Sequence, residues 1–236
     1  VILEIEAESS HPVQFKNQKF IRIGSYKKKL NDHPEKEKTL WRALDRKPFE
    51  DGIAEEKVTD ETILRLIDYP AYFDLLGLPI PDGRAAILNA LKEEKLIEPC
   101  EAGDWNLTTL GVLLFAKNLA DFPKLKRKAL RIIHYKGSNR IETQREHIEH
   151  KGYAVGFEGL IGYIMALIPT NEVIGSALRK SVPMYPELAI RELLANALTH
   201  QDFQITGAGP MVEIFDNRIE ITNPGLPLVS TERFLD

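Results

Sequence analysis

The sequence predicts a mixed α+β protein built from three parts. Its apolar pattern changes from short alternating strands, to three close helices followed by a hairpin, to alternating strands and helices. Hydrophobic residues make up 43% of the 236 positions, which is enough for more than one compact unit. We expect domains over residues 1–45, 58–128 and 129–236, with a linker over 46–57.

Charge is distributed unevenly along the chain. The net charge of −4 argues against a generic polyanion binder. Residues 14–30 nevertheless carry six Lys/Arg and no acid, and residues 117–145 carry nine Lys/Arg against two acids. Such segments indicate localised phosphate contacts to DNA, although a solvated surface explains like charges equally well. The best candidates for these contacts are Arg22, Lys27, Lys28, Lys29, Lys126, Arg127 and Lys128.

Cysteine usage and hydropathy bear on the compartment. Cys100 is the single cysteine, so no internal disulfide forms, which favours a reducing environment. No apolar run approaches the roughly 20 residues that span a bilayer, so we expect a cytoplasmic protein without a membrane partner. The chain starts at Val1 in what looks like the middle of a strand, so we expect it to be part of something longer.

The first part combines short strands with a helix. Strand-favouring residues occur near Ile2 and Ile5 and again over 20–23, and residues 34–44 have a helical pattern. Glu4, Glu6 and Glu8 alternate, so they share one strand face. A nuclease needs clustered carboxylates to hold divalent ions, but the same spacing is equally the polar face of an edge strand.

The central part has the element order of a winged helix. Thr59 is expected to cap the first helix of this part. In winged helices that read DNA, the third helix lies in the major groove. The expected exposed positions of that helix are Asn89, Lys92, Glu93 and Glu94, within a segment, 57–110, that nets −5. Contact with DNA and packing against other protein therefore both remain open. The expected elements are helices over 60–66, 71–76 and 84–95, a hairpin over 96–107, and a helix over 109–117.

The last part contains the most informative pair of residues. Glu192 and Asn196 lie four positions apart in an otherwise apolar helix over 186–199, so they project from one face. Burying these groups is costly unless something binds them, so the pair is a candidate site. The alternative is an ordinary buried polar pair that forms hydrogen bonds with the backbone of a neighbouring loop. The other elements expected here are strands over 129–135, 212–215 and 219–221 and a helix over 154–167.

Several of these stretches resemble bacterial proteins described as RecG-related ATP-binding proteins or Schlafen-like transcriptional regulators. The resemblance implies the end of an AlbA-like DNA-binding domain, a central winged helix and a divergent Bergerat-type (GHKL-type) ATP-binding domain that stops before its lid. No phosphate loop of the Gly-Lys-Ser/Thr type occurs, so helicase activity is not supported. The resemblance is carried by residues 19–25, 27–29, 40–41, 191–197, 200–203 and 213–225.

By that resemblance, Glu192 takes the position that activates water, and Asn196 the position that binds Mg²⁺ through the nucleotide. A carboxylate can act as a general base and a carboxamide oxygen is a hard ligand, so the chemistry is consistent. Asn223 and Gly225 fall where adenine is recognised. His200 is a candidate for phosphate contact, or equally a histidine favoured at a helix C-terminus by the dipole.

The sequence departs from the family pattern at three places. Asn223 is neutral where an aspartate is usual, Pro224 removes a backbone donor, and Thr199 replaces a usually acidic residue. Together with the missing lid, these departures argue against ATP turnover by this fragment, while weak ATPase activity of the full-length protein stays open.

The leading hypothesis is a DNA-binding transcriptional regulator whose ATP- and Mg²⁺-dependent state modulates DNA binding. Two alternatives belong to other classes. One is an enzyme, either a Schlafen-like nuclease or an ATPase. The other is a protein-interaction scaffold, a homodimer, with a vestigial nucleotide pocket.

Overall fold

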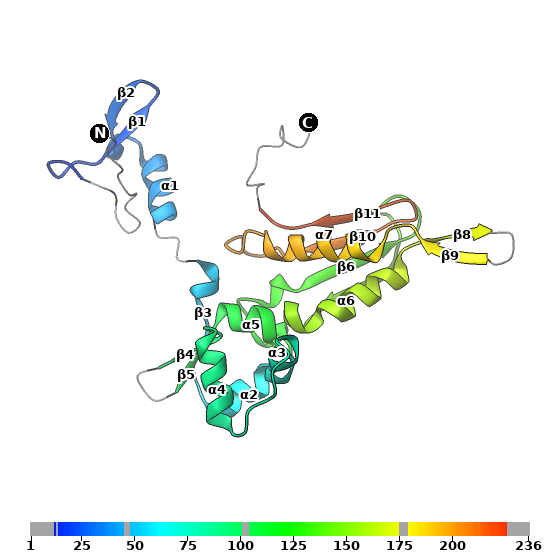
Figure 1. Cartoon of the computed structure of the whole chain (residues 1–236). Helices are drawn as coiled ribbons and strands as arrows, with labels where there is room; N and C mark the ends of the chain where they lie inside the picture. Colours follow the sequence, from blue (N-terminus) through cyan, green and yellow to red (C-terminus); the bar gives the residue numbers. More distant parts are fainter. Residues whose placement is uncertain (1–11, 13, 45–47, 101–103, 175–178, 226–236) are drawn as a thin grey trace, which may run out of the picture. The chain divides into compact units, whose positions relative to one another are not determined.

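The computed structural model describes residues 12, 14–44, 48–100, 104–174 and 179–225. It is a mixed α+β structure, as the sequence predicts, and it divides into two compact units, 1–49 and 50–236 (Figure 1). Two sets of residues from the sequence analysis lie outside the described residues. They are the strand-favouring Ile2 and Ile5 and the alternating acids Glu4, Glu6 and Glu8.

The first unit is a β-hairpin packed with one helix. Strand β1 (Phe20–Ile23) pairs antiparallel with β2 (Tyr26–Lys29), and the 3-10 helix η1 (Leu30–Asp32) leads into α1 (Pro34–Leu44). Lys19 Nζ donates to Glu37 Oε1 at 2.8 Å and also lies 4.9 Å from the Trp41 ring centroid, which ties the hairpin to α1. The strand and helix predicted over 20–23 and 34–44 are confirmed.

The described part of the second unit begins with a three-stranded sheet and four helices. Thr59 caps α2 as predicted, because its hydroxyl oxygen accepts from Thr62 N at 3.3 Å. The predicted helices and hairpin strands are present with small shifts at their ends, and the predicted turn at 101–103 lies outside the described residues. The elements are β3 (Ile53–Val58), α2 (Asp60–Leu66), α3 (Tyr69–Leu75), α4 (Arg84–Glu93), β4 (Ile97–Pro99), β5 (Trp105–Thr108) and α5 (Thr109–Phe115).

The predicted linker over 46–57 is wrong for its second half. Residues 53–57 belong to β3, which pairs with β5 and so completes a sheet in the order β3-β5-β4. Acidic residues suggested a linker, but their side chains are simply the exposed ones of a strand whose Val58 is buried. The pairing of β3 with β5 shifts register between Glu55 and Val58, where Lys57 has φ 55°. This irregularity obscures the alternation of buried and exposed residues expected of a strand.

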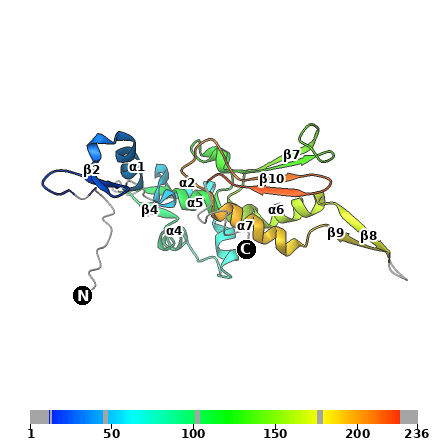
Figure 2. The same cartoon turned by 90° about the horizontal axis from the view of Figure 1, so that it is seen from above.

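A four-stranded sheet in the order β11-β10-β6-β7 forms the rest of the second unit, and α6 and α7 cover one of its faces (Figures 1 and 2). Strands β6 and β10 run parallel and the outer pairs run antiparallel. Ile190, Leu194, Ala197 and Leu198 form the buried side of α7. The elements are β6 (Leu130–Tyr135), β7 (Thr143–Glu149), α6 (Tyr153–Leu167), β8 (Thr170–Ile174), β9 (Arg179–Pro183), α7 (Glu187–Thr199), β10 (Met211–Ile214) and β11 (Ile219–Thr222), with 3-10 helices η2 (Phe49–Asp51), η3 (Leu119–Asp121) and η4 (Lys126–Lys128).

Strand β7 and the β8–β9 hairpin were not predicted. Strand β7 has the sequence TQREHIE and is largely exposed, so it lacks the apolar alternation by which a strand is recognised. It forms because its backbone pairs with the buried strand β6. No helix among the described residues combines the length and the apolar character needed to cross a membrane.

Replacing Leu194 by alanine should destabilise the protein by about 2–5 kcal/mol, because its side chain is fully buried and its loss removes apolar contacts and leaves a cavity. Leu188→Ala on the same helix is the control, since Leu188 is 77% exposed. It should change stability by less than about 0.5 kcal/mol. Urea unfolding followed by circular dichroism measures both, and equal effects would contradict the placement of α7.

Candidate functional site

The pair Glu192 and Asn196 is exposed, which corrects the expectation that it is buried. Both residues lie on the side of α7 opposite Leu194. Asn196 Nδ2 donates to Glu192 Oε1 at 3.1 Å, so one turn of helix separates two groups that bind each other. The cost of burial therefore gives no reason to infer a ligand here. Because both side chains are exposed, the pair remains accessible to a ligand from solvent.

The residues predicted around the Asn-Pro-Gly bend are brought together at the end of α7. Asn223 Nδ2 donates to the carbonyl of His200 at 3.0 Å, and Asp202 N donates to the carbonyl of Pro224 at 2.7 Å. Gly225 has φ 133° and a side chain there would meet Asp202 N at 3.1 Å, which explains the glycine. His200 is exposed, and its own N–H donates to Asn196 O, as a helix C-cap does.

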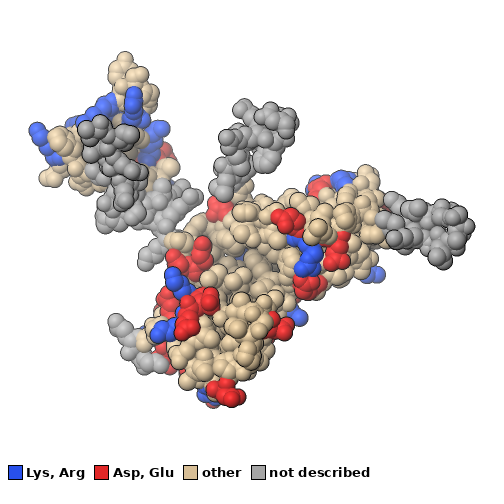
Figure 3. Space-filling model, viewed as in Figure 1, with Lys and Arg blue, Asp and Glu red and all other residues tan. Residues whose placement is uncertain are grey.

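The basic residues of the first unit lie on an exposed hairpin. The register places Phe20 opposite Lys29 and Arg22 opposite Lys27, so these four side chains share one face, and Lys28 lies on the other. Lys27 Nζ lies 3.9 Å from the Phe20 ring centroid, a cation–π contact. Figure 3 shows Lys and Arg gathered over this hairpin. Arg22 and all of β2 are exposed.

The second basic cluster, Lys126 to Lys128, divides into two exposed residues and one buried residue. Lys126 and Arg127 are exposed, whereas Lys128 is 3% exposed and donates from Nζ to Ile205 O at 2.7 Å. Burial lowers the pKa of Lys128, while the nearby Asp202 carboxylate opposes that shift. The prediction that Lys128 contacts phosphate is therefore wrong, because its ammonium faces the interior.

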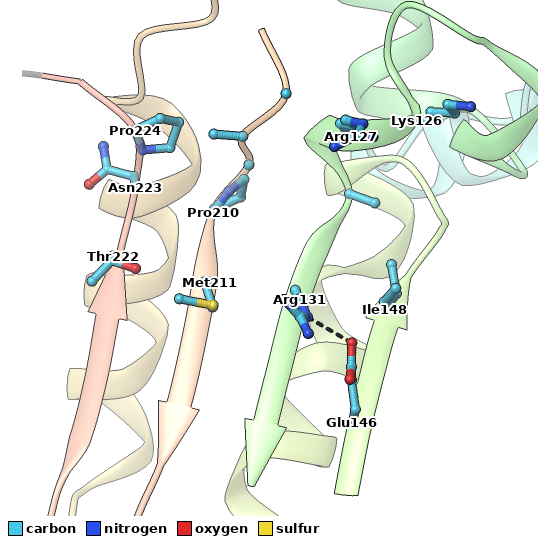
Figure 4. A pocket seen from close by; sticks show the side chains of 14 residues that line it. Lys126, Arg127, Arg131, Glu146, Ile148, Pro210, Met211, Thr222, Asn223 and Pro224 are labelled. Carbon is cyan, nitrogen blue, oxygen red and sulfur yellow. Dashed lines mark hydrogen bonds and ion pairs between the residues drawn. The ribbon is translucent and has the colours of Figure 1, made fainter. Parts of the chain in front are cut away.

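A cavity of about 600 Å³ opens on the face of the sheet that α6 and α7 leave uncovered (Figure 4). Strand residues Ile148, Arg131, Met211 and Thr222 form one cross-strand row in its wall. Its remaining lining comes from the loop before β10, the bend after β11, η4 and β7: Lys126, Arg127, Ala129, Glu146, Gly207, Ala208, Gly209, Pro210, Asn223 and Pro224. Of the predicted nucleotide residues, only Asn223 lines this cavity.

An ion-pair cluster occupies the same sheet face further along the strands. Arg140 donates from Nε and Nη2 to the two carboxylate oxygens of Glu213, at 2.6 and 2.8 Å, and its Nη2 also donates to Glu220. Arg218 Nε donates to Glu220 at 2.6 Å. The Arg140 guanidinium lowers the pKa of the Glu213 carboxyl, and burial of that carboxyl opposes the shift. Sequence patterns did not reveal this cluster, because its members come from three separate segments.

The exposed positions expected on the third helix are found where predicted. Asn89, Lys92, Glu93 and Glu94 are all exposed on or beside α4. Their charges sum to −1, which does not favour contact with DNA phosphates. In the described ranges, no group of three or more His, Cys, Asp or Glu side chains is placed to hold a metal ion.

Comparisons with known proteins establish a general fold. No protein-family model matches the chain, and no curated protein matches it. Among solved structures, the DIP2311 protein from Corynebacterium diphtheriae superposes over 93% of this chain with a TM-score of 0.52 and 16% sequence identity. The chain covers 42% of the length of that protein. At this identity the likeness supports the mixed α+β fold alone.

The Arg140–Glu213 pair should make stability depend on pH in the acid range. Because the pKa of Glu213 is lower in the folded protein, the pair contributes stability above the carboxyl's ordinary pKa of 4.5, and that stability is lost as pH falls through the lower folded value. Glu213→Gln should therefore flatten the loss of stability below about pH 5. Glu142→Gln is the control, since that carboxylate is 63% exposed. Thermal unfolding across pH 3–7, roughly, distinguishes the two.

Proposed function

We propose that this protein binds nucleic acid through the basic face of the β1–β2 hairpin, mainly by contacts to the phosphate backbone. The observation that carries the proposal is the shared exposed face of Arg22, Lys27 and Lys29. Lys and Arg contacts to phosphate provide most of the affinity of such interfaces and little of their base preference. The aromatic rings of Phe15 and Phe20 beside Lys27 add surfaces on which a base can stack.

The distribution of charge supports the same choice of surface. Residues 1–49 carry 11 Lys/Arg against 7 Asp/Glu, for a net +4, so residues 50–236 net −8 in a chain of −4. A polyanion is therefore attracted to the first unit and repelled on average by the second. In this proposal the central helices contact protein, because the exposed positions of α4 are acidic overall.

The finer domain assignment also belongs to the proposal. The hairpin and α1 would be the end of an AlbA-like domain, residues 58–128 a winged-helix unit, and residues 129–236 a divergent Bergerat-type domain. The order of the elements supports this assignment, since three helices precede the β4–β5 hairpin and two helices cover one face of the last sheet. The biological role that fits is transcriptional regulation.

A second proposal is that nucleotide binds at the end of α7. It is supported by the convergence of His200, Asn223 and Gly225 beside the exposed Glu192–Asn196 pair. Asn196 would then hold Mg²⁺ through the nucleotide phosphates and Glu192 would orient water, the roles that the family resemblance implies.

The salt dependence of DNA binding tests the first proposal. Lys27→Ala combined with Lys29→Ala should reduce the slope of log K against log salt concentration by about 2 on duplex DNA, because two phosphate contacts are lost. Fluorescence anisotropy between about 50 and 200 mM salt measures the slope. The matched control is Lys36→Ala with Lys38→Ala, which removes the same charge from exposed positions of α1. Equal effects of the two double variants would contradict a hairpin interface.

Isothermal titration with ATP and Mg²⁺ tests the second proposal. Asn196→Ala should weaken binding about tenfold, because one cation ligand is removed. Leu193→Ala is the control, since Leu193 is a 51% exposed neighbour on the same helix without a polar group. Absence of heat with the wild-type protein would favour a scaffold with a vestigial pocket.

A further inference from the structure

The cavity on the open sheet face concentrates positive charge in an acidic part of the chain. Three cations, Lys126, Arg127 and Arg131, line it against the single carboxylate of Glu146. Arg131 and Glu146 neutralise each other through a 2.7 Å contact. Lys126 and Arg127 form no ion pair with any described residue, so the cavity keeps an excess of two positive charges while residues 50–236 net −8.

The backbone that carries these two cations is fixed by buried contacts. The Tyr153 hydroxyl donates to Lys128 O at 2.6 Å, and Lys128 Nζ donates to Ile205 O. Burial raises the pKa of Tyr153 to about 12, so this hydroxyl stays protonated and remains a donor. Gln201 Nε2 in turn donates to the Tyr153 oxygen at 3.1 Å. The η4 turn is therefore held by a hydrogen bond to its backbone and by another from its buried lysine. The backbone positions of Lys126 and Arg127 are fixed as a result.

The loop opposite η4 packs directly against it. A side-chain carbon at Gly209 would lie 2.4 Å from the carbonyl oxygen of Arg127, so only glycine permits this approach. Arg131 N donates to Pro210 O at 3.1 Å, which joins the loop to the start of β6. Figure 4 shows Lys126 and Arg127 at one end of the cavity, with Arg131 and Met211 further along the strands.

The rest of the cavity is mixed. Ile148, Met211, Pro210 and Pro224 provide apolar surface, and Thr222 and Asn223 add hydrogen-bonding groups at one wall. The Arg131–Glu146 ion pair lies on the strands between Ile148 and Met211. A volume of about 600 Å³ falls within the range of sites for small ligands. Cations at one end and apolar surface along the walls match a ligand with an anionic head and an apolar body.

We infer that this cavity binds a small phosphorylated molecule, with its phosphoryl group held by Lys126 and Arg127 and its apolar body against Ile148 and Met211. Arginine and lysine are the residues that favour phosphate, arginine through paired hydrogen bonds and lysine as a point charge. The lining shares no residue with the hairpin and only Asn223 with the nucleotide residues predicted in the last part of the chain. It therefore goes beyond the proposed function and does not rest on it.

Titration of the full chain with phenyl phosphate tests the inference, with inorganic phosphate and phenol as the two half-ligands. Phenyl phosphate should bind more tightly than either, because it alone occupies both ends of the cavity. Lys126→Ala combined with Arg127→Ala should weaken that binding about tenfold or more. Ile148→Glu should also weaken it, by placing a carboxylate on an exposed strand position beside the ligand.

Two control variants make the outcome decisive. Arg84→Ala with Lys92→Ala removes one arginine and one lysine from exposed positions near α4 and should leave phenyl phosphate binding unchanged. Lys27→Ala with Lys29→Ala should also leave it unchanged, whatever it does to DNA binding. No binding, equal affinity for inorganic phosphate, or equal loss in the cavity and α4 double variants would overturn the inference. The inference would also be overturned if the Lys126 and Arg127 double variant lost binding to a single-stranded oligonucleotide but kept binding to phenyl phosphate. That result would assign these two cations to nucleic-acid binding.

Discussion

The parallel pairing of β6 with β10 is the constraint on which the second unit depends. It joins residues about 80 positions apart, and it aligns Arg131 with Met211 and Ile133 with Glu213. Because side chains alternate across a strand, this register decides which residues face α6 and α7 and which face outward. A shift by one residue would turn Glu213 away from Arg140 toward the face that the helices cover, and would expose Val212, which is fully buried. The ion pairs and the cavity therefore both follow from one backbone pairing.

The buried contacts of Lys128 show how this register is connected to the surface. A lysine in an apolar interior is costly unless its ammonium is hydrogen-bonded, and Ile205 O provides the acceptor. Tyr153 at the start of α6 and Gln201 after α7 belong to the same network. Both helices that cover the sheet are thus tied to the turn that carries Lys126 and Arg127.

Much of the fold could be predicted from the sequence, but the geometry of the candidate sites could not. The helix over 34–44 and the Thr59 cap follow from local signals that act within a few residues. Strand β7 escaped prediction because its stability comes from pairing with β6 and its side chains are largely exposed. The Glu192–Asn196 spacing correctly predicted a shared face, whereas burial of that face depends on what packs against α7. Periodicity carries no information on which side of a helix meets a sheet when both sides contain leucine.

The two basic clusters illustrate the same limit in terms of electrostatics. Both are three-residue runs of Lys and Arg, yet Lys27 to Lys29 are all exposed on a strand while Lys128 is buried beside two exposed neighbours. In a strand alternate residues face opposite sides, so a hairpin exposed on both faces can expose every cation. In a 3-10 turn of three residues one side chain points toward the body of the protein, and here that residue is Lys128. The charge of the run is therefore divided between a structural contact and a surface that can bind an anion.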